Sequence, residues 1–123
     1  MPGIKHIEFW VTDLRASLKF YDQLFSLLEW KRIDENAFSD GVTKIYFVEQ
    51  SVPAQRNVGP RHICFLAKSK SVVDSVGAFL LASKCALIRG PLEAPYLNRS
   101  SYTVDFKDPD GYVLEVATKS VAL

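Results

Sequence analysis

The sequence predicts an α+β fold made of two βαβββ repeats that form a curved mixed sheet shaped like an open barrel or cup. The first observation is a repeated pentamer, because residues 5–9 (KHIEF) return as residues 61–65 (RHICF). The second is that the same order of strand and helix patterns follows each copy. A repeat of about half the chain indicates two related supersecondary units. We therefore predict one domain over residues 1–123, with repeat units at about 1–50 and 60–118.

The first unit begins with a strand at residues 4–11, where apolar and polar side chains alternate. A helix over residues 13–27 follows, and Thr12 or Asp13 is its predicted N-cap. Its apolar stripe has helical spacing and consists of Leu14, Leu18, Tyr21, Phe25 and Leu28. Asp40-Gly41 is a turn before the last strand of the unit. The three remaining strands are predicted at residues 29–33, 36–40 and 43–49.

The second unit follows a linker predicted at residues 50–60, which are rich in proline, glycine and polar side chains. It opens with a strand at 61–67 and a helix over 70–84, for which Ser69 is the N-cap. The inner face of that helix is predicted to hold Val72, Val76, Phe79 and Leu80. The residues Asp108-Pro109-Asp110-Gly111 form a tight turn between the last two strands. The remaining strands are predicted at 85–89, 100–107 and 112–118.

Composition narrows the classes of function. The net charge is +1 and the basic residues are scattered, so the chain has no basic footprint for nucleic acid or for a membrane surface. No apolar run approaches the length of about 18 residues that a membrane span needs. The charged residues near the N-terminus argue against a signal peptide. Two cysteines, Cys64 and Cys85, are too few for a disulfide framework and are typical of reduced thiols in a cytoplasmic protein.

Strand periodicity predicts which side chains line the inner surface of the cup. The turns make each sheet largely antiparallel, with its helix on the outer face. Side chains of alternate residues then point to the opposite, inner face. The equivalent positions on the last strands of the two units are Tyr46 and Glu115. The other inward side chains are predicted to be His6, Glu8, Trp10, His62, Cys64, Leu66, Thr103, Asp105 and Lys107.

These faces predict a metal site. The only two histidines of the chain, His6 and His62, occupy the same place in the two repeats. Glu115 lies between Leu114 and Val116, where a carboxylate is costly to bury unless it is paired or binds a cation. Two imidazoles and one carboxylate form the facial triad that suits divalent transition metals, and three protein ligands leave positions open for a substrate.

Other readings of the same residues remain. Glu115 could pair with Lys107 or Arg61 instead of a metal, and Glu8 could be a solvated residue at the mouth of the cup. Cys64 lies beside the predicted site, where a small buried thiol is favoured over a nucleophile.

The chain resembles the vicinal oxygen chelate superfamily, which includes glyoxalase I, fosfomycin-resistance enzymes, extradiol dioxygenases, methylmalonyl-CoA epimerase and bleomycin-resistance proteins. The resemblance covers essentially the whole chain. It rests on His6-Ile7 opening a strand, on Arg61-His62-Ile63, and on the closing motif that runs from Asp108 to Glu115 (DPDGYVLE). Within the first helix it includes Asp13-Leu14, Ser17 and Phe20-Tyr21.

The resemblance implies that His6, His62 and Glu115 are the metal ligands. The fourth ligand position, which is a glutamate in glyoxalase I, falls on Tyr46. This departure implies a three-ligand site, as in the fosfomycin-resistance enzymes and the extradiol dioxygenases. Glu8 stands on the same strand face as His6 and is the candidate catalytic base. The resemblance also implies a homodimer, with the two units paired within one chain or between chains.

We therefore expect a small cytoplasmic metal-dependent enzyme that binds a small substrate through two oxygens. The reaction classes are lyase, isomerase, transferase or dioxygenase, and the ion is Fe, Mn, Zn, Ni or Co. Substrate contacts are predicted from Trp10, Tyr46, Cys64 and Asp105, and from Tyr96 and Arg99 in a loop over residues 90–100 that rims the pocket. The main alternative is a metal-free protein that sequesters a small molecule, as bleomycin-resistance proteins do. A regulatory domain with a vestigial site is the third.

Overall fold

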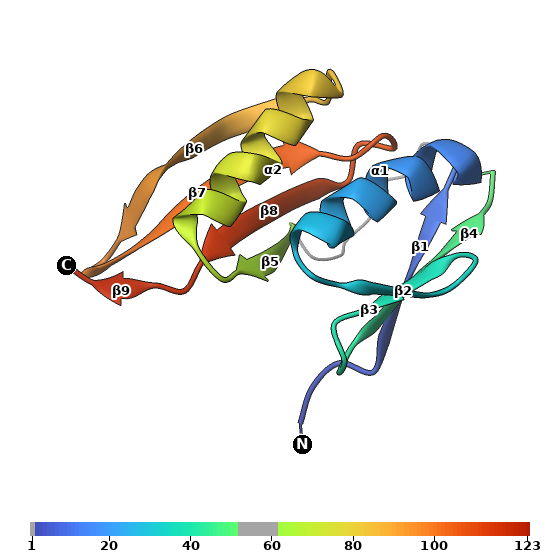
Figure 1. Ribbon diagram of the computed structural model, residues 1–123, viewed down its shortest axis with the longest axis horizontal. Coiled ribbons are helices and arrows are strands. Elements are labelled where there is room, and N and C mark those ends of the chain that lie inside the picture. Colours follow the sequence, from blue (N-terminus) through green and yellow to red (C-terminus); the bar gives the residue numbers. More distant parts are fainter. Residues whose placement is uncertain (1, 52–61) are drawn as a thin grey trace. The chain divides into compact units, whose positions relative to one another are not determined.

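The computed structural model describes residues 2–51 and 62–123, which divide into two compact units, Met1–Val58 and Gly59–Leu123. Each unit is a mixed sheet with one helix, and both have the predicted order βαβββ (Figure 1). The α+β fold class and the repeated unit are therefore confirmed. Most of the predicted linker at 50–60 lies outside the described residues.

The first unit holds four strands and α1 (Leu14–Leu27). The strands are β1 (His6–Val11), β2 (Lys31–Asp34), β3 (Ala37–Ser39) and β4 (Lys44–Glu49). Their order in the sheet is β1-β4-β3-β2, with β1 parallel to β4 and the other pairs antiparallel. The sheet is thus largely antiparallel, as predicted. Phe9, Tyr21 and Phe47 pack between α1 and the sheet, with 4.4 Å between the ring centroids of Tyr21 and Phe47.

Helix α1 begins at the predicted cap. The Asp13 carboxylate accepts a hydrogen bond from the Ala16 N–H at 3.1 Å, and Glu49 Oε1 accepts one from the Leu14 N–H at 3.0 Å. Both carboxylates satisfy N–H groups that the helix leaves unpaired. The predicted inner stripe was partly wrong, because Leu14, Leu18 and Leu28 are only half-buried. The buried face of α1 is rotated about the helix axis relative to the predicted stripe. It consists of Ser17, Phe20, Tyr21, Leu24 and Phe25.

The second unit repeats the first and extends it. It consists of β5 (Ile63–Ala67), α2 (Lys70–Ala82), β6 (Leu87–Tyr96), β7 (Arg99–Lys107), β8 (Val113–Thr118) and β9 (Val121–Ala122). The order β5-β8-β7-β6 matches that of the first sheet, and β5 is parallel to β8. Helix α2 covers one face of this sheet (Figure 1). Ser69 caps α2, since its Oγ accepts a hydrogen bond from the Val72 N–H at 3.3 Å.

The packing of α2 depends on a glycine. A Cβ atom at Gly77 would lie 2.7 Å from Cγ of Pro91 on β6, so only glycine allows this approach of helix and strand. The buried face of α2 is Val73, Val76, Gly77 and Leu80. Val72 and Phe79, which the spacing placed on this face, are half-buried instead.

The predicted loop over residues 90–100 was wrong. Strand β6 runs through Tyr96 and pairs with β7, and Leu97 and Asn98 form the turn between them. This part of the strand was not predicted because it contains a glycine and two prolines, which are typical of loops. These residues are tolerated because β6 is an edge strand with two register shifts in its pairing with β7. Residues 119–123, which follow the last predicted strand, include the short strand β9, which pairs with β7.

Neither described helix is long and apolar enough to cross a membrane.

Candidate functional site

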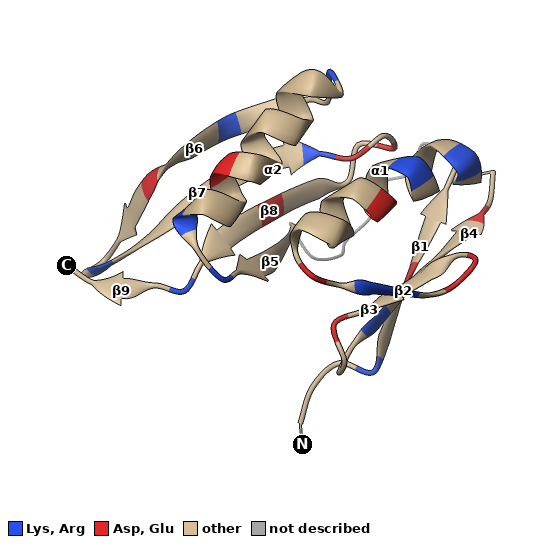
Figure 2. Ribbon diagram, viewed as in Figure 1, with Lys and Arg blue, Asp and Glu red and all other residues tan. Residues whose placement is uncertain are grey.

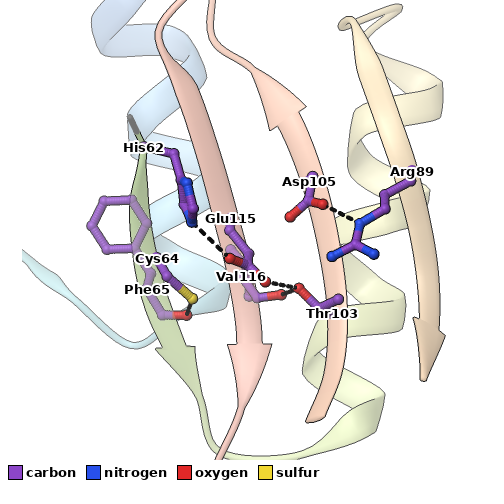
Figure 3. Close-up of polar contacts among 8 residues, drawn as sticks. All are labelled: His62, Cys64, Phe65, Arg89, Thr103, Asp105, Glu115 and Val116. Atoms are coloured by element: carbon purple, nitrogen blue, oxygen red, sulfur yellow. Dashed lines mark hydrogen bonds and ion pairs between the residues drawn. The ribbon is translucent and has the colours of Figure 1, made fainter. Parts of the chain in front are cut away.

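The second sheet carries a cluster of polar side chains on the face opposite α2 (Figure 3). Buried Leu114 and Val116 pack on the helix side of β8, so Glu115 between them points to the open face. Pairing across the sheet places Cys64, Glu115, Asp105 and Arg89 in one row, on β5, β8, β7 and β6 respectively. The predicted inward orientation of Glu115 and Asp105 agrees with this arrangement.

The centre of the cluster is a pair formed by His62 and Glu115. His62 Nε2 lies 3.0 Å from Glu115 Oε1 (Figure 3). The hydroxyl of Thr103, which is fully buried, donates a hydrogen bond to the other carboxylate oxygen, Oε2, at 2.5 Å. Both oxygens of Glu115 are therefore held in place by neighbouring side chains. Lys107 is not its partner, and Arg61 lies outside the described residues.

The separation of this pair is that of an ordinary hydrogen bond, and it is also compatible with two ligands of one divalent ion. Two donor atoms that each lie about 2.1 Å from one ion, at right angles, are about 3.0 Å apart. His62 Nε2 and Glu115 Oε1 have that separation, and Thr103 supplies the outer hydrogen bond that orients a ligating carboxylate. Within the described residues, no group of three histidine, cysteine or carboxylate side chains converges on one point. The pair thus offers two ligands of the three that the sequence predicts.

Cys64 lies beside the pair and is a weak nucleophile. Although the residue as a whole is exposed, its sulfur is partly buried, and this burial raises the pKa of the thiol to about 12. The negative charge of Glu115 and a hydrogen bond to its carboxylate contribute to this raised pKa. The thiolate, which is the reactive form, is therefore scarce at neutral pH. A lining role for Cys64 is consistent with this, and a nucleophilic one is not.

Asp105 and Arg89 form an ion pair at the other end of the row (Figure 3). Arg89 Nε donates a hydrogen bond to Asp105 Oδ2. This contact and the nearby charges of Asp105 and Glu115 raise the pKa of the Arg89 guanidinium. Asp105 is therefore a polar group of the open face, as predicted, but it is already engaged.

The first unit carries its own cluster on β1 and β4. Glu8 lies opposite Tyr46 in the sheet, and its Oε2 accepts a hydrogen bond from the Trp10 indole at 2.6 Å. Hydrogen bonds from Trp10 and Tyr46 lower the pKa of Glu8, so this carboxylate is ionised at neutral pH. The ring of His6 stacks obliquely on that of Tyr46, with centroids 5.5 Å apart, and Lys44 Nζ lies 5.0 Å from the centroid of the Tyr46 ring. His6, Glu8, Trp10 and Tyr46 are thus neighbours, as the strand periodicity predicts.

Two predicted substrate contacts do not join the His62–Glu115 pair. Tyr96 and Arg99 face each other across the turn between β6 and β7, where Tyr96 is 78% exposed. Arg99 donates a hydrogen bond to the Ser120 carbonyl at 2.7 Å. Asp105 follows Arg99 by six positions along β7, which is about 20 Å of extended strand.

The roles of two residues at this site, Thr103 and Arg89, were not predicted from the sequence. Thr103 was placed on the inward face but given no role, and Arg89 was assigned only to a strand. Thr103 has a usable signal, because it shares the strand parity of Asp105 on β7. Arg89 has a weaker one, because the register shifts in β6 hide which residue of β7 it faces.

The chain matches the model of the Glyoxalase/Bleomycin resistance protein/Dioxygenase superfamily over residues 3–116. It belongs to this superfamily. Among solved structures, a proposed glyoxalase from Bacillus halodurans is similar, with a TM-score of 0.78 and 24% identity over 94% of this chain and 95% of that one. A glyoxalase/bleomycin resistance protein from Albidiferax ferrireducens gives a TM-score of 0.76 at 20% identity, covering 94% of this chain and 98% of that one.

The lactoylglutathione lyase of Agrobacterium tumefaciens has a TM-score of 0.63 at 25% identity, over 94% of this superfamily member and 92% of the lyase chain. No curated protein matches the sequence. The likenesses below 25% identity show the fold alone.

Proposed function

We propose that this superfamily member is a divalent-metal-dependent enzyme that acts on a small substrate with two neighbouring oxygen donors. The observation that carries the proposal is the convergence of His62 Nε2 and Glu115 Oε1 at 3.0 Å on the open face of the second sheet. The buried hydroxyl of Thr103 supports it, because a carboxylate that only balanced a surface charge would need no such anchor.

His62 and Glu115 would hold the ion. His6 is the proposed third ligand on the strength of the sequence repeat, and it comes from the same chain or from a second copy. Imidazole nitrogens and a carboxylate suit Fe, Mn, Zn, Ni or Co. When bound, the ion would supply a Lewis acid that polarises the two substrate oxygens.

Glu8 is the proposed base. Hydrogen bonds from Trp10 and Tyr46 lower its pKa, so it is ionised at neutral pH and, as a weak base, would accept a proton only from an acidic carbon or oxygen of the substrate. The same hydrogen bonds fix the direction of the carboxylate. Lyase, isomerase, transferase and dioxygenase chemistry are all consistent with a fixed carboxylate beside a polarised substrate.

Metal analysis of tag-free protein purified without chelator tests the proposal. We expect about one equivalent of a divalent ion in the wild type, and loss of that ion in both His62→Ala and Glu115→Gln. Glu93→Gln is the matched control, because Glu93 pairs with Lys70 on the helix side of the sheet. Metal-free wild-type protein with an intact circular dichroism spectrum that also fails to bind added Zn²⁺, Mn²⁺ or Co²⁺ would contradict the proposal.

A metal-free binding protein is the second candidate. Two large apolar side chains favour it, since Trp10 is 47% and Leu66 is 68% exposed on the open faces of their sheets. Trp10 fluorescence distinguishes the two functions. Quenching by an aromatic ligand that is unaffected by chelator and by Glu115→Gln would favour the binding protein. Quenching that requires the metal would favour the enzyme.

We also propose that the protein is a cytoplasmic homodimer, on the basis of its reduced cysteines and of the superfamily. Light scattering coupled to size-exclusion chromatography measures the assembly directly, with a mass of about twice 13.8 kDa expected. A mass of one chain at all concentrations would contradict the dimer.

A further inference from the structure

Two carboxylates face each other on the open side of the second sheet. Asp105 on β7 and Glu115 on β8 are directly paired, and like charges in such positions repel. Arg89 follows in the same row on the edge strand β6. Figure 2 shows an acidic position on β8 and a basic position on β6. One arginine can offset the charge of only one of the two carboxylates. A divalent ion on Glu115 would therefore leave the row with a net positive charge.

The ion pair with Asp105 orients Arg89 but leaves the Nη groups of its guanidinium available to a ligand. Its Nε donates to Asp105 Oδ2, and Asp105 is itself mostly buried, with 17% of its side chain exposed. The Arg89 side chain is 49% exposed, and among the residues that the structure describes its two Nη groups have no hydrogen-bond partner. Figure 3 shows these groups on the open face. A guanidinium fixed through Nε presents its terminal N–H groups in the geometry that binds a planar oxyanion.

We propose that Arg89 is a specificity-determining residue that binds a carboxylate of the substrate, and that Asp105 positions it. This inference rests on the proposed metal-dependent function. Adjacent strands are about 4.8 Å apart, so β8 and β6 are separated by about 10 Å at this row. The Arg89 side chain extends into part of that interval. The substrate is thus a small acid in which the carboxylate lies only a few bonds from the two chelating oxygens.

Two hydroxamates test the inference on Zn²⁺-loaded protein. Acetohydroxamate chelates a metal through two oxygens and is otherwise neutral, whereas succinate monohydroxamate adds a carboxylate. We expect the acidic probe to bind wild-type protein about tenfold more tightly, the value of one added charge-assisted contact. Arg89→Gln should abolish that preference and leave the affinity for acetohydroxamate unchanged. Arg32→Gln is the control, because Arg32 also pairs with an aspartate, in the first unit.

A second substitution at Arg89 separates the effect of its charge from that of its planar shape. Arg89→Lys retains the charge but not the planar fork, so it should keep only part of the preference, and it replaces Arg89→Gln if that variant does not fold. Equal preference for the acidic probe in wild type and in a folded Arg89 variant would overturn the inference and leave the proposed function intact.

The acetohydroxamate titration also shows whether the proposed metal site itself is wrong. If acetohydroxamate does not bind at all, the proposed function fails, and succinate added to metal-free protein then decides the role of Arg89. A saturable shift of the Arg89 Nε–H signal in the ¹⁵N spectrum would support the inference. An unchanged signal would overturn it.

Discussion

Among single residues, Thr103 does most to hold the Glu115 carboxylate in place. Thr103 is fully buried, and its hydroxyl donates a hydrogen bond to Glu115 Oε2. The Val116 carbonyl oxygen lies 3.2 Å from the same hydroxyl. Outer partners of this kind fix the orientation of a ligating carboxylate. Thr103 is therefore a positioning residue, and it binds neither metal nor substrate in our proposal.

The Thr103→Val substitution tests this role. It keeps the shape of the side chain but removes the hydrogen bond, so the Kd for Zn²⁺ should rise by about 10- to 100-fold. Thr103→Ser keeps the hydroxyl and should stay close to the wild type. Calorimetric titration measures both affinities, and circular dichroism checks that the fold persists. Equal Kd values for the valine and serine variants would show that the hydroxyl has no such role.

At the scale of elements, strand periodicity in the sequence predicted most of what the structure shows. It placed Glu115 on the open face because Leu114 and Val116 had to be buried, and the structure agrees. Periodicity could not predict β6, where glycine, proline and two register shifts break the alternation. For the same reason the contact between Arg89 and Asp105 could not be predicted. It depends on how two strands pair, which no single strand encodes.

Helix α2 provides an element-scale prediction at Gly77. Alanine normally stabilises a helix interior by about 1 kcal/mol relative to glycine. At Gly77 the added Cβ would meet Pro91 Cγ at 2.7 Å, so the helix or β6 must shift. We expect Gly77→Ala to lower the free energy of unfolding by about 1–3 kcal/mol, the usual cost of overpacking. Urea denaturation measures this value. A stabilised Gly77→Ala protein would contradict the described packing of α2 on β6.

The contact between α2 and β7 predicts a dependence on pH. Tyr102 donates a hydrogen bond from its hydroxyl to Asp74 Oδ1 at 2.6 Å, and this bond raises the pKa of Tyr102 in the folded protein. A pKa that is higher in the folded state contributes stability below the ordinary tyrosine pKa of about 10, and this contribution is lost as the pH rises through the raised value. Tyr102→Phe should therefore lower the Tm at pH 8 and have a smaller effect above pH 11. Melting curves across this range measure both. A Tm difference that stays constant with pH would count against this link.

At the scale of the whole molecule, the two repeats contribute different chemistry to equivalent positions. Strand β4 carries Tyr46 where β8 carries Glu115, and β1 carries Glu8 where β5 carries Cys64. The first unit thus offers an ionised carboxylate and an imidazole, and the second offers the anchored His62–Glu115 pair. The sequence repeat predicted these equivalences from alternation alone. Strand parity places Thr103 on the same face as Asp105, but its hydrogen bond to Glu115 follows only from the pairing of β7 with β8.

The two histidines of the chain allow a direct test of the proposed three-ligand metal site. A long-range ¹H–¹⁵N spectrum of the tag-free protein contains the signals of only two imidazoles, so each can be followed during a titration with Zn²⁺. We expect the ring nitrogens of both His6 and His62 to change to metal-bound shifts and to stop changing at one equivalent of Zn²⁺. We also expect Glu115→Gln to weaken Zn²⁺ binding. Unchanged imidazole signals in a folded protein, or a change confined to one histidine, would contradict the proposed three-ligand site.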